Sequence, residues 1–137
     1  MSTDVRTSAN IEATSRIYEA VPAGDAATVF ALLDPEIVIT YYGNDEIPYA
    51  GTFSGVEGAT DFFTRVGESV EIVSMEPQRF IADGDHLASF GHQVFRARAT
   101  GREFASNFAH VIELRDGKWL RFHDFMNSAL AAEAFRA

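Results

Sequence analysis

The alternation of apolar and polar positions divides the chain into a helical first part and a strand-rich remainder. Apolar residues three and four apart predict an amphipathic helix over 10–21, after a flexible N-terminus over 1–9. Asp25 is placed as the N-cap of a short second helix, and Ser54 with Glu57 has capping-box spacing before a third helix. Between these two helices, the β-branched and aromatic run 36–42 predicts a strand, and a loop follows it.

The remainder of the chain predicts a meander of long strands and a short final helix. The strands are expected over 70–82, 86–99, 102–115 and 118–127, with turns at Asp-Gly and Thr-Gly pairs, and the helix over 128–135. Helices first and antiparallel strands last predict an α+β fold, a curved antiparallel sheet with helices on its concave side. A chain of 137 residues can bury one sizeable core, so residues 10–137 are expected to form a single domain.

The last predicted hairpin places two titratable residues within an apolar face. Strand side chains alternate between faces, so His110 shares one face with Phe108, and Asp124 shares one with Phe122. The turn at 116–117 decides whether these faces coincide. A two-residue loop would place the even positions of the two strands on opposite faces, whereas a three-residue loop would place them together.

The hydrophobic pattern favours the three-residue loop, because it keeps the apolar even positions of both strands on one buried face. On that register Asp124 lies opposite Phe108, and His110 is its diagonal neighbour. An acid and an imidazole within an apolar face predict a small-molecule pocket. The odd positions would then face outward, and a second copy of the chain is expected to cover the three large ones, Val111, Trp119 and Phe125.

Composition narrows the possible partners. The net charge of −9 argues against nucleic acids and anionic membrane surfaces, and the absence of cysteine excludes disulfides and thiol chemistry. Twelve phenylalanines suit a deep core or an apolar cavity wall. The first residues lack a signal-peptide pattern and no apolar run is long enough to span a membrane, so a cytoplasmic location is predicted. The four histidines lack the spacing of a metal site.

Several sequence segments, in a characteristic order, carry a resemblance to a known family. They are AGDAATVFALLDPEIVI, GTFSGVEGATDFF, RARATGREF and FAHVIELRDGKWLRFHDF. The chain resembles the nuclear transport factor 2-like superfamily and, within it, the SnoaL-like proteins, the group that includes polyketide cyclases and ketosteroid isomerase relatives. The resemblance implies a cone-shaped, cystatin-like barrel around three helices with an internal pocket, no cofactor, and a homodimer formed through the outer sheet face.

The resemblance can also be followed at individual positions. Asp124 stands where limonene epoxide hydrolase and SnoaL-type cyclases hold an essential aspartate, and His110 where ketosteroid isomerase has an oxyanion-hole aspartic acid. Thr40 stands in place of that isomerase's proton-abstracting carboxylate. Ile17 replaces its catalytic tyrosine, with Tyr18 turned off that face. The segment GHQVFRARA lacks the aspartate that the epoxide hydrolase needs. The resemblance therefore implies a cyclase-like carboxylate and imidazole rather than steroid isomerisation or epoxide hydrolysis.

The leading hypothesis is a cofactor-free acid/base enzyme (isomerase, cyclase or hydratase type) on a small apolar carbonyl compound. Asp124 would transfer the proton, and His110 would bind the developing enolate or orient Asp124. His92 faces the pocket only if the turn at ATGR has three residues, whereas a two-residue turn points Gln93 and Phe95 inward. The alternative hypothesis is a non-catalytic ligand-binding or scaffold protein of the same fold. The predicted substrate-binding residues are Tyr42, Thr40, Phe108, Phe122, Met126 and His92.

Overall fold

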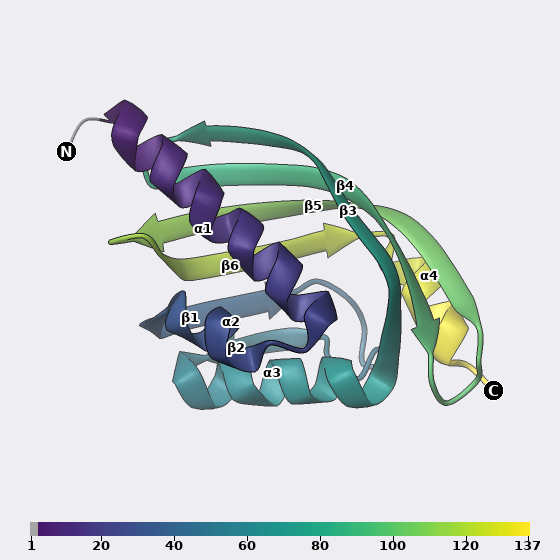
Figure 1. Ribbon diagram of the computed structural model, residues 1–137. Coiled ribbons are helices and arrows are strands. Elements are labelled where there is room, and N and C mark those ends of the chain that lie inside the picture. Colours follow the sequence, from purple (N-terminus) through teal and green to yellow (C-terminus); the bar gives the residue numbers. More distant parts are fainter. Residues whose placement is uncertain (1–2) are drawn as a thin grey trace.

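The computed structural model describes residues 3–137 and confirms the α+β fold (Figure 1). A curved sheet forms one layer, and α1 runs across its concave side. None of the helices in the described part of the chain is long and apolar enough to cross a membrane. The elements are α1 (Thr3–Ala23), α2 (Ala26–Ala31), β1 (Leu33–Tyr41), β2 (Gly51–Ser54), α3 (Gly55–Ser69), β3 (Val70–Asp83), β4 (His86–Ala97), β5 (Glu103–Arg115), β6 (Lys118–Met126) and α4 (Ser128–Phe135).

The sheet has the strand order β2-β1-β6-β5-β4-β3, and it stays open rather than closing into a barrel. Strands β3 to β6 form the predicted antiparallel meander. Strand β1 pairs in parallel with β6, so the expectation of a wholly antiparallel sheet is wrong at this pair. The short strand β2 lies within the segment that the sequence predicts as a loop, and it pairs with β1. The first and last strands of the chain thus meet in the middle of the sheet.

Helix α1 begins earlier than its sequence pattern indicates. It starts at Thr3, so residues 3–9 of the segment 1–9 that was predicted to be flexible are helical, and residues 1–2 lie outside the described residues. The Thr7 hydroxyl accepts a hydrogen bond from the Gly84 backbone N–H, and the Asn10 side-chain amide donates to the Gly84 carbonyl, both at 2.8 Å. These bonds tie the first turns of α1 to the β3–β4 turn.

One stripe of α1 packs against the sheet. Residues 10, 13, 14, 17 and 18 follow the spacing of a buried helical face, and each of them is buried. Ile17 and Tyr18 therefore both point inward, and the prediction that Tyr18 is turned off the pocket face is wrong. The cause is the width of the stripe, because an apolar helical face of this kind accommodates two adjacent residues.

The β5–β6 hairpin combines features of both turn alternatives. Its loop has two residues, with φ of 54° at Asp116 and 78° at Gly117, and pairs Arg115 with Lys118. A β-bulge then follows, since Leu114 lies opposite Trp119 while Glu113 lies opposite Arg121. The extra residue in β6 returns its even positions to the same face as the even positions of β5. Trp119, before the bulge, faces inward.

The inward position of Trp119 overturns the prediction that this residue lies on the outer face. Its side chain is 3% exposed, and its indole N–H donates to the Thr14 hydroxyl of α1 at 3.1 Å. Val111 and Phe125 do face outward, with exposed fractions of 49% and 41%. The bulge explains why Trp119 faces inward and Phe125 outward although both are odd-numbered. It inserts one residue after Trp119, so the odd positions that follow lie on the opposite face.

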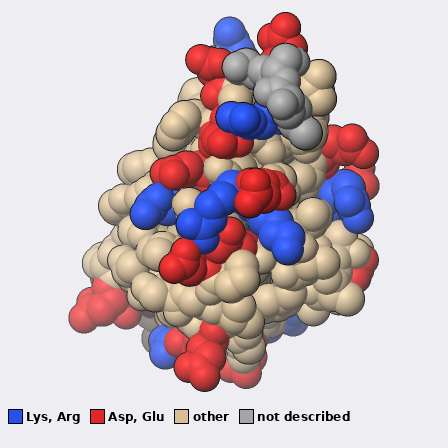
Figure 2. All heavy atoms as spheres, turned by 90° about the vertical axis from the view of Figure 1, so that its left-hand side faces the viewer, with Lys and Arg blue, Asp and Glu red and all other residues tan. Residues whose placement is uncertain are grey.

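Ion pairs hold the hairpin turn to the start of β1. The Arg115 guanidinium donates hydrogen bonds of 2.8 and 3.0 Å to the carboxylate of Asp34 and also pairs with Glu36. The bonds from Arg115, together with one from the Glu36 backbone N–H, hold the pKa of Asp34 below its ordinary range. Figure 2 looks onto this end of the molecule, where acidic and basic side chains are intermixed.

Candidate functional site

Asp124 and His110 face each other across the β5–β6 pair. The bulge makes them direct cross-strand partners, so Asp124 lies opposite His110 rather than opposite Phe108 as the predicted register had it. Nε2 of His110 lies 3.2 Å from Oδ1 of Asp124, and the two side chains are 2% and 14% exposed. The contact lacks the alignment of a hydrogen bond, so both atoms remain without a hydrogen-bond partner within residues 3–137. Such atoms are costly to bury.

Tyr18 extends this pair into a chain of three residues from three elements. Its hydroxyl lies 2.7 Å from Nδ1 of His110. Burial, and to a smaller extent the charge of Asp124, raises the pKa of Tyr18, so the phenol keeps its proton. When this hydroxyl donates to Nδ1, the neutral imidazole carries its hydrogen on Nε2, the nitrogen that lies 3.2 Å from Asp124.

Aromatic rings fix the imidazole in place. Phe108 stacks on His110 with 4.4 Å between ring centroids, and Phe122 lies at 4.7 Å. Phe108 in turn fits against Gly91 of β4, where a Cβ atom would come within 2.6 Å of its ring. The histidine therefore keeps Nδ1 toward Tyr18 and Nε2 toward Asp124.

The pair opens onto an internal cavity of about 70 Å³. This volume is enough for a few water molecules and is well below the roughly 300 Å³ of an ordinary ligand pocket. Half-buried side chains, including Phe63 and Val66 of α3, form part of its wall. The other lining residues are Ile17, Tyr18, Val21, Tyr41, Tyr49, Phe62, Ile72, Met75, Gln93, Phe95, His110, Trp119, Phe122 and Asp124.

The structure gathers some of the predicted binding residues at this cavity. Phe122 lines it beside the catalytic candidates. Phe108 supports His110 from below, as described above. Met126 is half-buried, and its sulfur accepts hydrogen bonds from the Tyr41 hydroxyl and the Gln93 amide. Phe108 and Met126 therefore do not line the cavity themselves, but they contact residues that do.

Tyr42 and Thr40 lie on the other face of the sheet, contrary to the prediction. Tyr42 is 43% exposed, stacks on Phe125 with 4.6 Å between centroids, and has its hydroxyl 2.8 Å from Nδ1 of His123. Thr40 pairs with His123 in the parallel register and shares this outer face. Residues 37–42 are apolar or aromatic at almost every position, so the sequence pattern does not reveal which set points inward. The residue that reaches the cavity is Tyr41.

His92 also points outward, which corrects its assignment to the pocket. Phe95 pairs with Phe104 across the β4–β5 connection, which places the odd positions of β4 inside. Gln93 and Phe95 line the cavity instead, as the alternative register proposed. His92 is half-buried on the outer face, where Nδ1 lies 3.1 Å from the Asn107 side-chain oxygen.

Sequence reasoning missed two tyrosines of the cavity. Tyr41 and Tyr49 lie edge to face with 4.9 Å between ring centroids, and both are almost fully buried. Burial, and in part the charge of Asp124, raises the pKa of both phenols, so they remain protonated donors. Tyr49 lies in the segment predicted as a polar loop, where only its aromatic character could have indicated burial.

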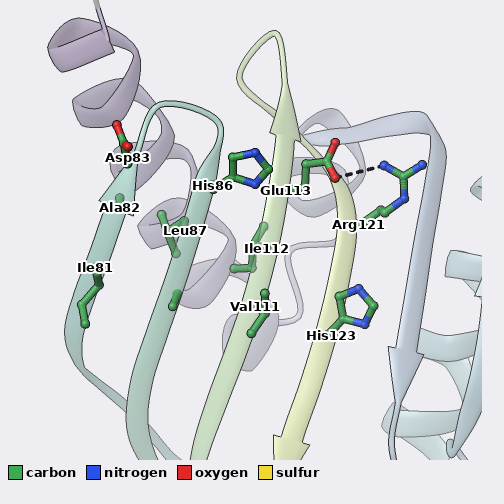
Figure 3. A pocket seen from close by; sticks show the side chains of 11 residues that line it. Ile81, Ala82, Asp83, His86, Leu87, Val111, Ile112, Glu113, Arg121 and His123 are labelled. Carbon is green, nitrogen blue, oxygen red and sulfur yellow. Dashed lines mark hydrogen bonds and ion pairs between the residues drawn. The ribbon is translucent and has the colours of Figure 1, made fainter.

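The outer face of the sheet carries a second, larger hollow of about 380 Å³ (Figure 3). Glu113 and Arg121 point toward one another there and form an ion pair at 3.0 Å. Val111 on β5 and Ile81 on β3 expose apolar surface in the same hollow. This hollow is open to solvent and lies on the side of the sheet opposite to His110 and Asp124.

Metal-binding clusters are absent from residues 3–137, where no group of three or more His, Asp or Glu side chains is placed to hold an ion. The site is built instead from one carboxylate, one imidazole and three phenols around the cavity. This set can move protons and donate hydrogen bonds.

Comparisons with known proteins agree with the fold. The family model of the SnoaL-like domain matches residues 14–122, and the chain therefore belongs to the SnoaL-like family. Its place in the nuclear transport factor 2-like superfamily is confirmed. Among curated proteins, no sequence matches this chain.

Solved structures with the same fold include proteins of several descriptions. An NTF2-like protein of unknown function from Burkholderia pseudomallei K96243 is 25% identical, with 94% of this chain and 98% of that chain covered and a TM-score of 0.84. TerC, crystallised with polyporic acid, is 23% identical, with 94% and 99% covered and a TM-score of 0.84. A candidate SnoaL-like polyketide cyclase from Jannaschia sp. CCS1 is 16% identical, with 96% and 94% covered and a TM-score of 0.79.

Proposed function

We propose that this protein is a cofactor-free acid/base enzyme that isomerises, cyclises or hydrates a small apolar carbonyl compound. The observation that carries the proposal is the Asp124–His110 pair, whose facing atoms are buried beside a cavity and lack hydrogen-bond partners among the described residues. Buried polar groups are normally satisfied, and exceptions concentrate at functional sites. The likeness to a candidate polyketide cyclase supports the same reaction class.

In the proposed mechanism Asp124 acts as the base. One carboxylate oxygen takes a proton from the carbon next to the substrate carbonyl, and the electron pair of that C–H bond moves to the carbonyl oxygen. Return of the proton to another carbon completes an isomerisation. Attack of the enolate carbon on a second carbonyl instead closes a ring, and the alkoxide oxygen formed by that attack takes the proton back from Asp124. His110, with Tyr18 behind it, holds the carboxylate in position. Such proton transfer typically contributes about 10²–10⁴-fold in rate.

Substrate entry requires movement of side chains at the cavity wall. A neighbouring hollow of about 120 Å³, between α1, α2 and α3, shares Val21 and Phe63 with the cavity. Phe63 is half-buried and packs edge to face against Phe30, with 6.0 Å between centroids. Displacement of the Phe63 ring would join the two spaces, and this provides a route from solvent to Asp124.

The test is the substitution Asp124→Asn, which keeps the size of the side chain and removes the base. A library of apolar ketones and phenols is first used to find a compound that the wild-type protein converts. We expect Asp124→Asn to lower its turnover by about 10²–10⁴-fold. Glu113→Gln on the outer face is the matched control and should retain full turnover. Equal turnover in Asp124→Asn and wild type, with both folded by circular dichroism, would exclude this role.

A specific observation favours the second candidate function, a non-catalytic binding or scaffold protein of the same fold. The cavity of about 70 Å³ is small for a substrate. Stability measurements separate the two functions. If the pair is structural, Asp124→Asn should lower the free energy of unfolding, whereas a pair retained for catalysis commonly costs stability, and its removal leaves that free energy unchanged or raised.

We also propose that two copies associate through the outer sheet face. Tyr42, Phe90 and Val111 are exposed there together with Phe125, and a large apolar patch of this kind usually marks a contact surface. Phe125→Glu should convert a dimer into a monomer of 15.1 kDa in sedimentation experiments. Leu130→Glu, on α4 and also 41% exposed, is the matched control and should remain dimeric. A monomeric wild-type protein at micromolar concentration would contradict the proposal.

A further inference from the structure

Two tyrosine–histidine pairs of nearly equal length lie in different surroundings. The Tyr18 hydroxyl of α1 lies 2.7 Å from Nδ1 of His110, and both side chains are buried. The Tyr42 hydroxyl lies 2.8 Å from Nδ1 of His123 on the outer face of the sheet, where Tyr42 is 43% exposed. Water competes for the exposed pair far more than for the buried one. The protein neighbours of His110 therefore decide which of its ring nitrogens carries a hydrogen.

Ser89 of β4 interacts with the same hydroxyl group of Tyr18. It is fully buried, is the cross-strand partner of His110, and has no other hydrogen-bond partner within residues 3–137. Burial raises the pKa of Tyr18, and a side-chain hydrogen bond with Ser89 opposes that rise. A hydrogen bond that favours the phenolate is one that the phenol oxygen accepts. The Tyr18 oxygen thus accepts from Ser89, and its own hydrogen is left for Nδ1 of His110.

Asp124 favours the same arrangement through the other ring nitrogen. Its Oδ1 lies 3.2 Å from Nε2 of His110, and both atoms are buried. A neutral imidazole has a hydrogen on one nitrogen and a lone pair on the other. A lone pair on Nε2 would face the negatively charged oxygen, whereas a hydrogen there is attracted to it. The phenol and the carboxylate therefore select the same tautomer of His110.

The aromatic neighbours of His110 prevent its two nitrogens from exchanging places. The ring centroids of Phe108 and Phe122 lie 4.4 and 4.7 Å from the centroid of the imidazole. A flip of the imidazole would have to displace these rings, because close-packed side chains leave little free space. The flip would also break the contacts of both nitrogens. The orientation of the ring is thus fixed together with its tautomer.

Resting on the proposed function, we propose that Tyr18 is a positioning residue that, with Ser89 behind it, fixes His110 as the neutral tautomer with its hydrogen on Nε2. The lone pair of that imidazole is then on Nδ1, where the Tyr18 hydroxyl occupies it. His110 is left without a lone pair that could take a proton from a substrate. Asp124 is thereby the base of the pair, and the Nε2 hydrogen, held against Oδ1, leaves Oδ2 to take that proton.

Nitrogen-15 NMR of the histidine rings tests the inference without a substrate. A ring nitrogen that carries a hydrogen resonates far upfield of one with a lone pair, and an imidazolium shows two upfield nitrogens. In the wild type near neutral pH, we expect an upfield Nε2 and a downfield Nδ1 for His110. Tyr18→Phe should lower the ratio of this tautomer to the other by about five- to tenfold, which corresponds to the loss of one hydrogen bond.

Two further variants and a turnover measurement complete the experiment. Ser89→Ala should change the His110 signals in the same direction as Tyr18→Phe and to a smaller extent. Tyr42→Phe removes the hydroxyl of the exposed pair, is the matched control, and should leave the signals of His110 unchanged. With a compound that the wild type converts, Tyr18→Phe should lower kcat about five- to tenfold and change KM by less than about twofold. Tyr42→Phe should retain full turnover.

Each outcome supports or overturns the inference. A hydrogen on Nδ1 of His110 in the wild type, two upfield nitrogens, or an unchanged His110 spectrum in Tyr18→Phe overturns it, and so does an unchanged kcat in that variant. If Tyr18→Phe does not fold, the wild-type spectrum and Ser89→Ala decide. Full turnover in Asp124→Asn, together with the expected wild-type spectrum, contradicts the proposed function and leaves the tautomer standing. The converse result contradicts the role of Tyr18 alone.

Discussion

The two ends of the β5–β6 hairpin differ in how completely their polar groups are satisfied. At the turn end, formed by residues 114–119, the Trp119 indole N–H has the Thr14 hydroxyl as acceptor, and Arg115 is paired with Asp34. At the pocket end, around residues 108–110 and 124–126, the facing atoms of His110 and Asp124 lack hydrogen bonds within the described chain. The turn end secures the fold, and the pocket end carries groups that reduce stability and suit chemistry.

The largest expected effect on stability belongs to the turn end. Trp119→Ala removes a buried aromatic side chain and leaves a cavity, so the free energy of unfolding should fall by about 3–5 kcal/mol in urea titrations. Lys118→Ala, at the exposed start of the same strand, is the control and should change it by less than about 1 kcal/mol. Similar losses in both variants would remove the distinction between buried and exposed positions of β6.

Packing at the pocket end can be tested through a pair of glycines. A Cβ atom at Gly91 would lie 2.4 Å from the Glu76 carbonyl oxygen and 2.5 Å from the Phe108 ring. Gly91→Ala should therefore lower the free energy of unfolding by about 1–3 kcal/mol. Gly67→Ala in α3 meets no atom within 4 Å and should raise it by about 0.5–1 kcal/mol. Equal changes in the free energy of unfolding for the two variants would show that the Phe108 ring moves aside for the added methyl group at little cost.

A smaller effect, dependent on pH, is expected from the ion pair at the turn end. Because the pKa of Asp34 is lowered in the folded state, its contribution to stability is present above the ordinary aspartate value of about 3.9 and is lost as the pH falls through the folded-state value. The stability difference between wild type and Asp34→Asn should thus shrink below about pH 4. In an Arg115→Ala background the same substitution should have little effect. A difference independent of pH would contradict this account.

The sequence predicted the elements of the meander and the inward faces of β5 and the pocket end of β6, because these strands alternate clearly between apolar and polar residues. It failed where the alternation is ambiguous or interrupted. Strand β1 is apolar on both faces, so the inward position of Tyr41 depends on its parallel register with β6. The bulge after Trp119 is not visible in the pattern, although it decides that Asp124 meets His110 directly.

The candidate site residues that the sequence indicated differ in the same way from those that it missed. Asp124 and His110 were found from their place in an apolar face, a local signal. Tyr18, Tyr41 and Tyr49 come from a helix, a strand and a loop that only tertiary structure brings together, and a tyrosine in any of these is compatible with the surface as well as the core. The sequence left open which face of β4 points inward, because this depends on the length of the connection between β4 and β5. The structure shows that length.

The parallel pairing of β1 with β6 has a consequence for the order in which the protein folds. The β5–β6 hairpin joins neighbouring segments and can form quickly, whereas Ile39 must find Phe122 across more than half of the chain length. Contacts between distant segments slow folding, because a long loop must close before they form. On the ribosome, β1 emerges well before β6 and must wait for it. The sheet is therefore completed only after β6 has also emerged.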